Sequence, residues 1–231
     1  MDLCGSELPV DGVAFDERHF PRSDGEYLAQ LKKMAVDTGL AVEALAATFE
    51  PAAEGALERL EASLQMAAVL GAPLAVVRLG ASQALGATLG QVVHALKEAA
   101  GAAKRLNVTI ALRNAPGTAA AGVADLKTLS KQIDSAWLRY AVDVVELPQE
   151  ATEPSELRRD AVAGYHATGS IDTFGADERN DLRAVLRFFE GFPGPLILAY
   201  DGAEEERTAV PRLVKWVRGM LAKDTATKAT M

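Results

Sequence analysis

The chain has 231 residues, a formal net charge of -8, 49% hydrophobic residues and a single cysteine, Cys4. The acidic charge argues against a nucleic-acid partner, because binding a polyanion requires a basic face. A lone cysteine excludes an internal disulfide and a thiolate metal cluster. The apolar content suffices for one hydrophobic core, and no linker of Ser, Gly or Pro divides the chain.

The two ends of the chain and its longest apolar stretch bear on location. The N-terminus has no basic segment followed by an apolar run, so we expect no signal peptide. The apolar stretch 66–79 is interrupted by Gly71, Pro73 and Arg78, which argues against a membrane span. We therefore expect a cytoplasmic protein with a single domain over residues 1–223 and a frayed C-terminal tail over residues 224–231.

Short apolar, β-branched runs recur about every thirty residues, which is the length of one strand and its crossover helix. They predict seven strands, which start near Val13, Val42, Leu74, Val108, Leu138, Val162 and Leu196.

Helical patterns lie between these runs. The first two share an apolar face over 27–35 and 57–68, and they stop at Gly39 and Gly71, which suit a left-handed cap. Thr88 and Gln91 form a capping box for a helix that continues to about 103. Pro154 suits the first turn of a short helix. The last two patterns cover 182–189 and 210–221.

This alternation predicts an α/β fold of the TIM type, a (β/α) barrel that is incomplete, with seven βα units and the first unit missing. An open doubly wound sheet is the alternative, but no glycine-rich phosphate turn follows the first strand. The N-terminal segment either leaves the gap open or fills it irregularly. An open gap exposes strand edges, so it predicts a covering segment or a homo-oligomer.

In such a barrel the C-terminal ends of the strands meet at one mouth, where function resides. They supply a mixed polar set: Phe15 and Asp16, Leu45 and Ala46, Arg78, Arg113 and Asn114, Asp143, His166, and Tyr200 and Asp201.

Four of these strand ends resemble the xylose isomerase-like TIM-barrel family of sugar phosphate isomerases and epimerases. The resemblance is carried by Leu112-Arg113-Asn114-Ala115-Pro116-Gly117, Ala141-Val142-Asp143, Tyr165-His166 and Leu198-Ala199-Tyr200-Asp201-Gly202. It implies a site in which Glu, Asp, His and Glu hold a divalent cation and the glutamates move protons between sugar carbons. This chain has Asp143 and His166 at two of these positions, but Arg113 and Ala199 stand where the resemblance implies glutamates.

These departures lead us to expect no metal and no other cofactor, with a weakly held Mn²⁺ or Mg²⁺ as the alternative. An arginine facing a divalent ion would repel it by about 8 kcal/mol at a separation of ~4 Å and an effective dielectric of ~20. We expect a small polar ligand bound by Arg78, Arg113, Asn114, Asp143, His166 and Tyr200. The structural alternatives are that Asp143 simply pairs with Arg113 and that His166 is a hydrogen-bonded interior histidine.

Three functions are consistent with this sequence. The first is a metal-free, non-catalytic relative, a pseudoenzyme that binds a sugar-like or anionic ligand or serves as a scaffold. The second is an active sugar phosphate isomerase or epimerase with relocated acid and base groups; its catalytic residues are unknown, with His166 and Asp143 as candidates and Glu146 or Asp201 in reserve. The third, a phosphodiester-cleaving relative, needs several zinc ligands, and the chain has only three histidines.

Overall fold

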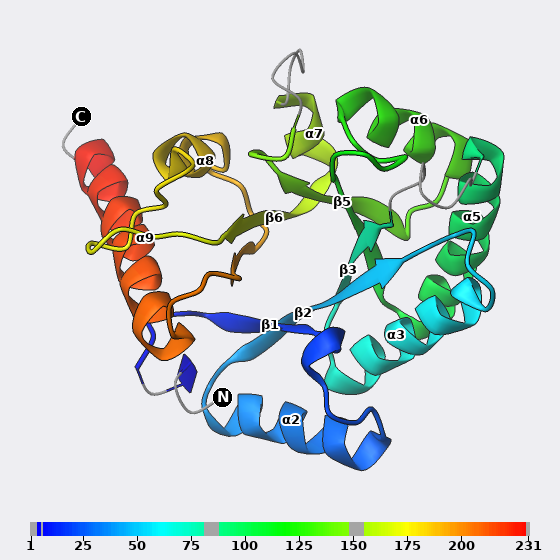
Figure 1. Cartoon of the computed structure of the whole chain (residues 1–231), viewed down its shortest axis with the longest axis horizontal. Helices are drawn as coiled ribbons and strands as arrows, with labels where there is room; N and C mark the ends of the chain where they lie inside the picture. Colours follow the sequence, from blue (N-terminus) through cyan, green and yellow to red (C-terminus); the bar gives the residue numbers. More distant parts are fainter. Residues whose placement is uncertain (1–3, 6, 81–87, 148–154, 230–231) are drawn as a thin grey trace.

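The computed structural model describes residues 4–5, 7–80, 88–147 and 155–229. Strands and helices alternate along the chain, and the strands curve into a nearly closed barrel (Figure 1). The strands are β1 (Gly12–Asp16), β2 (Ala41–Phe49), β3 (Leu74–Leu79), β4 (Thr109–Arg113), β5 (Leu138–Asp143), β6 (Ala161–Thr168) and β7 (Leu196–Tyr200). The helices are η1 (Glu17–His19), α2 (Gly25–Asp37), α3 (Ala56–Leu70), α5 (Leu89–Leu106), α6 (Val123–Ile133), α7 (Ser155–Asp160), α8 (Leu182–Phe188) and α9 (Glu206–Ala229).

The sheet has the strand order β1-β2-β3-β4-β5-β6-β7, and every neighbouring pair is parallel. Each strand starts within one residue of its predicted start. The prediction of a TIM-type barrel with seven βα units is therefore confirmed. Among the described residues β1 and β7 are not paired with each other, so the barrel has an open seam.

Alternate side chains of the strands form two separate cores. The outward side chains, such as Val77, Leu112 and Val142, belong to a large cluster between the sheet and the helices. The inward side chains form a small cluster of Ala44, Leu74, Val76, Ala111, Ala141, Ala163, Tyr165 and Ile197. Four of these eight are alanines, so half of the side chains in the middle of the barrel are small.

The helix ends follow the predicted signals. Gly39 and Gly71 have φ values of +74° and +80°, and Thr88 with Gln91 forms the expected capping box of α5. Helix α6 was not predicted, although its buried side chains at 123, 126, 129 and 133 have helical spacing. Helix α9 continues to Ala229, so the domain boundary placed at residue 223 does not coincide with a helix end. Pro154 lies outside the described residues.

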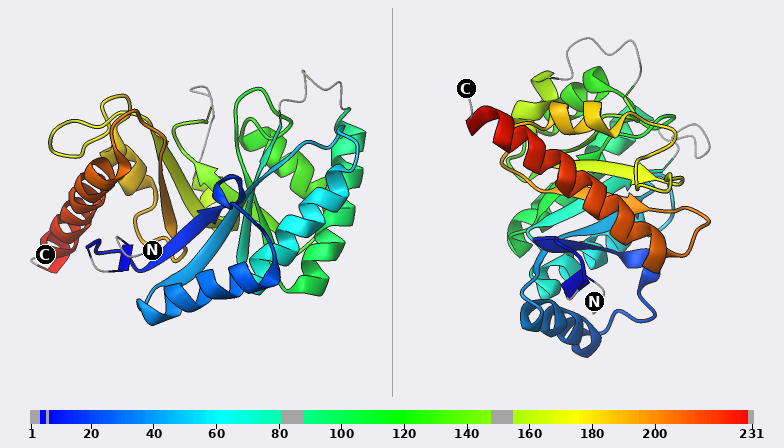
Figure 2. Two further views of the ribbon diagram at one scale, coloured as in Figure 1. Left: turned by 60° about the horizontal axis from the view of Figure 1, so that its bottom comes forward. Right: turned by 90° about the vertical axis from the view of Figure 1, so that its left-hand side faces the viewer.

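The seam between β1 and β7 contains a cavity of about 830 Å³. Gly12 to Ala14 of β1 and Leu196 to Leu198 of β7 line it, together with apolar side chains of α9. The N-terminal segment runs beside α9 here (Figure 2), and Arg218 of α9 donates a hydrogen bond to the carbonyl of Pro9 at 2.6 Å. Cys4, Leu8 and Val10 also line the cavity, so the described part of this segment partly covers the seam, and it forms no strand before Gly12. In that range no helix has the length and apolar character that crossing a membrane requires.

Candidate functional site at the mouth of the barrel

The mouth is lined by side chains that follow the inward cluster by two residues on each strand. Arg78 follows Val76, Arg113 follows Ala111, and Asp143 follows Ala141, so strand alternation points all three inward at the C-terminal end of the sheet. Tyr165 belongs to the inward cluster itself and is paired in register with Asp143.

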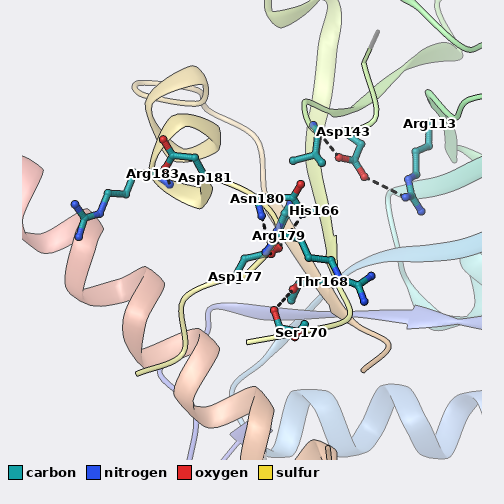
Figure 3. Close-up of polar contacts among 11 residues, drawn as sticks. Arg113, Asp143, His166, Thr168, Ser170, Asp177, Arg179, Asn180, Asp181 and Arg183 are labelled. Atoms are coloured by element: carbon teal, nitrogen blue, oxygen red, sulfur yellow. Dashed lines mark hydrogen bonds and ion pairs between the residues drawn. The ribbon is translucent and has the colours of Figure 1, made fainter. Parts of the chain in front are cut away.

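Arg113 and Asp143 form an ion pair across the ends of β4 and β5, with Nη2 and Oδ2 3.0 Å apart (Figure 3). Only 15% of the Arg113 side chain and 2% of the Asp143 side chain are exposed. The guanidinium lies over the ring of Tyr165, with its Cζ 3.9 Å from the ring centroid. Its buried Nε has no acceptor among the described residues. The predicted pairing of Arg113 with Asp143 is therefore confirmed.

Asn114 positions this pair rather than facing the mouth. Its Nδ2 donates to the Asp143 carbonyl at 2.9 Å, and its Oδ1 accepts from the Asp143 backbone N–H at 2.8 Å. The side chain is fully buried. The amide therefore joins the ends of β4 and β5. Because both of its polar atoms are bonded to the Asp143 backbone, it is not directed at a ligand in the mouth.

Burial raises the pKa values of both Asp143 and Tyr165. For Asp143 the charges of Arg113 and His166 oppose this rise, and Glu146 adds to it. For Tyr165 the charge of Arg113 again opposes the rise, whereas Asp143 adds to it. The Tyr165 phenol therefore stays protonated at neutral pH, and its raised pKa makes it a poor general base.

His166 lies on the opposite face of β6, so the expectation that it joins the mouth is wrong. The pairing of β6 with β5 shifts register between Tyr140 and Ala141, where Val162 is the extra residue. Such a bulge reverses the facing of every later side chain on the strand, so Tyr165 points inward and His166 outward. Gly164 confirms the outward face, because a Cβ added there would lie 2.7 Å from Phe189.

On that outer face His166 contacts Asp177 in the loop that follows β6. Its Nε2 lies 2.9 Å from Oδ2 of Asp177, and both side chains are fully buried. Asp177 also accepts from the Arg179 and Asn180 backbone N–H groups, at 2.8 and 2.9 Å (Figure 3). Burial favours the neutral carboxyl, but these hydrogen bonds outweigh it and lower the pKa of Asp177. Of the two interpretations of His166, the structure therefore shows the hydrogen-bonded interior histidine.

The remaining predicted residues divide between the two faces. Ala199 packs against the inward cluster, where the resemblance implies a glutamate. Tyr200 is paired in register with Thr168 and therefore faces outward, away from the mouth. Arg78 is exposed on the inward face, and no described carboxylate lies within 4.0 Å of it.

A second ion pair stands at the end of β1 and was not predicted. Nη2 of Arg18 lies 2.6 Å from Oδ2 of Asp16, and Nε of Arg18 bonds both carboxylate oxygens at 3.0 Å. Burial raises the pKa of Asp16, but the hydrogen bonds from Arg18 outweigh it, so the pKa lies below its ordinary value. Asp16 is the register partner of Ala46, which lies two residues after inward Ala44, so Asp16 also points into the mouth.

The four positions implied to hold a metal do not converge in this structure. Arg113 and Ala199 carry no anionic ligand, and His166 is turned to the outer face. Within the described ranges no group of three or more His, Cys, Asp or Glu side chains is placed to hold a metal ion. The residues at the mouth therefore fit an ion-paired, polar site better than a divalent cation.

The fold and the polar mouth define a (β/α) barrel of the kind that carries its site at the strand C-termini. The chain belongs to the xylose isomerase-like TIM barrel family, whose model matches residues 5–220. No curated protein matches the sequence.

Solved structures with the same fold include several sugar epimerases. L-ribulose 3-epimerase is 16% identical, with 96% of this chain and 87% of that chain covered and a TM-score of 0.74. The 3-keto-D-glucoside 4-epimerase of E. coli is 16% identical, with 92% and 90% covered and a TM-score of 0.69. D-psicose 3-epimerase from Clostridium cellulolyticum H10 is 10% identical, with 93% and 89% covered and a TM-score of 0.74. At these identities the similarity shows the fold alone.

Proposed function

We propose that this chain is a metal-free, non-catalytic member of its family that binds a small polar ligand at the mouth of the barrel. The Arg113–Asp143 ion pair is the observation that carries this proposal. It places a permanently charged guanidinium beside the one acidic residue that matches the implied metal ligands, so the carboxylate already has a cationic partner. A divalent ion would have to displace this partner and to approach its positive charge.

The alternative is an active sugar isomerase or epimerase, as the names of the structural neighbours suggest. This function needs a group that removes a proton from a sugar carbon. The candidate couple of His166 and Asp143 is divided between the two faces of the sheet. Tyr165 does face the mouth, but burial raises the pKa of its phenol and so opposes its use as a base. The geometry therefore favours binding over catalysis.

Calorimetric titration of the chelator-stripped protein with Mn²⁺, Mg²⁺, Co²⁺ and Zn²⁺ tests the proposal. The natural protein is compared with an Arg113→Glu, Ala199→Glu double variant, which adds two carboxylates on the inward face beside Asp143. Arg105→Glu is the control for charge, because Arg105 is an exposed residue of α5. We expect no binding by the natural protein or the control, and binding by the double variant.

Metal binding by the natural protein that disappears in an Asp143→Asn variant would overturn the proposal. Interconversion of ketohexose epimers by the metal-free natural protein would overturn its non-catalytic part. These two results are separate, because the first concerns the ligands of a cation and the second concerns turnover.

A further inference from the structure

The inward face of the barrel carries an uninterrupted row of hydrogen-bond donors across three neighbouring strands. Thr48 of β2 is the register partner of Arg78 of β3, and Arg78 is the register partner of Arg113 of β4. Neighbouring strands lie about 4.8 Å apart, so these three side chains leave the sheet side by side and on the same face. Two adjacent guanidinium groups repel each other, and an anion between them would relieve this repulsion.

Much of the donor capacity in this row is unused. A guanidinium has five N–H groups. Arg113 donates one hydrogen bond to Asp143, and its Nε has no acceptor among the described residues. Arg78 has neither a hydrogen bond nor an ion pair with any described residue, and its side chain is exposed. Thr48 is also exposed, and its bond to Glu17 is made by the backbone N–H, so it does not use the hydroxyl.

The acidic groups nearby do not neutralise Arg78. Asp143 is paired with Arg113, and Asp16 is held by three hydrogen bonds from the Arg18 side chain. Glu146 acts electrostatically on Asp143, which lies on the side of Arg113 away from β3. Glu17 also lies nearby, but its carboxylate bonds the Thr48 backbone N–H and the Ser63 hydroxyl. No described carboxylate lies within 4.0 Å of Arg78, so its guanidinium has no counter-charge among the described residues.

We propose that Arg78 and Arg113, assisted by the Thr48 hydroxyl, bind an oxyanion group of a small ligand, a carboxylate or a phosphate. Arginine suits such groups because its planar fork donates two parallel hydrogen bonds to two oxygens. The stacking of Arg113 on Tyr165 and its bond to Asp143 hold that guanidinium in place before the ligand arrives. This assignment rests on the proposed function and narrows its ligand from polar molecules in general to anions.

Calorimetric titration of the chelator-stripped protein with inorganic phosphate, succinate and neutral D-xylose tests the assignment. Phosphate and succinate distinguish the two oxyanion sources, and D-xylose represents a neutral ligand. Each is titrated into the natural protein, Arg78→Gln, Arg113→Gln and the control Arg105→Gln. Arg105→Gln removes the same charge from an exposed ion pair with Glu61, away from the row.

We expect phosphate or succinate to bind the natural protein and the control equally. Arg78→Gln should weaken that binding about tenfold, as the loss of one charge-assisted hydrogen bond does. Arg113→Gln should weaken it at least as much. Because loss of Arg113 also removes the partner of buried Asp143, a melting curve accompanies that variant. Arg78 is exposed, so Arg78→Gln tests the assignment even if Arg113→Gln fails to fold.

Equal anion affinity in Arg78→Gln and Arg105→Gln would overturn the assignment, and so would the absence of binding by both anions. If D-xylose binds and the anions do not, the assignment fails while the proposed polar-ligand function survives. If the anions bind through Arg78 and the natural protein also binds Mn²⁺ through Asp143, the metal-free function fails while the anion site stands.

Discussion

Replacing Arg113 by methionine leaves the Asp143 carboxyl in a site where 2% of its side chain is exposed. Unit charges about 4 Å apart interact by about 4 kcal/mol at an effective dielectric of ~20, and removing one partner of a buried pair costs roughly 3–5 kcal/mol. Asp143 can escape part of this cost by taking up a proton. We therefore expect Arg113→Met to lower the free energy of unfolding by about 3 kcal/mol at pH 8.

The complementary change, Asp143→Asn, leaves the guanidinium of Arg113 without its counter-charge but keeps an acceptor for the Val145 N–H. We expect a loss of about 3 kcal/mol here too. The double variant Arg113→Met, Asp143→Asn should lose about 4 kcal/mol rather than 6, a coupling of about 2 kcal/mol. Urea unfolding followed by circular dichroism measures all four proteins, with the exposed Arg105→Met as the control. Losses that add to within about 0.5 kcal/mol would refute the ion pair.

The loss in Arg113→Met should also depend on pH. Burial raises the pKa of Asp143 in the folded protein, and Arg113→Met removes the largest charge that opposes this rise. A raised folded-state pKa means that the stability contribution is fully present below the unfolded value of about 3.9 and is lost as the pH rises through the folded pKa. The deficit of Arg113→Met should therefore grow from pH 4 to pH 8, and a deficit that shrinks over this range would contradict the argument.

Two further changes concern the loop after β6. Asp177→Asn weakens the buried contact with His166 and should lower the free energy of unfolding by about 2 kcal/mol at pH 7. Because the folded-state pKa of Asp177 is lowered, its contribution is present above the unfolded pKa and lost as the pH falls below about 4, so the two proteins should converge in acid. Equal stability at pH 7 would refute this role. Gly175→Ala places a Cβ 2.2 Å from the Arg212 carbonyl at a φ of +95°, whereas Gly117→Ala has a φ of +73° and open space. In thermal melts we expect a loss of about 3 kcal/mol for Gly175→Ala and about 1 kcal/mol for Gly117→Ala, and similar losses would show that the contact with α9 is unimportant.

The strands could be predicted from the sequence because each is a short apolar run in a chain of regular period. A parallel strand covered on both faces needs no polar alternation, so its position is easy to predict while its facing is not. This explains why the start of β6 was predicted and the side of His166 was not. The run from Val162 to Tyr165 gives no period-2 signal, and the bulge that sets its facing depends on pairing with β5.

The candidate site divides in the same way. The pairing of Arg113 with Asp143 follows from residue types at neighbouring strand ends, so the sequence was sufficient. Tyr165 was missed because its place in the mouth depends on the bulge, and Arg18 because it follows the strand and reaches back to Asp16. The sequence could not fix the place of Asn114 for a different reason. An amide beside a strand end can bind either a ligand or the next backbone, and in the fold its amide bonds the Asp143 backbone.

The alanines in the middle of the barrel limit its circumference. An eight-stranded TIM barrel fills its interior largely with branched side chains, whereas here four of the eight residues in the inward cluster are alanines, namely Ala44, Ala111, Ala141 and Ala163. A wall of seven strands surrounds a narrower interior than a wall of eight, and methyl groups are small enough to fit there. Larger side chains at these positions would push the strands apart. The sheet would then open further between β1 and β7, where no strand pairing holds it. The smallness of these four side chains therefore allows the sheet to curve until, among the described residues, only the seam between β1 and β7 stays unpaired.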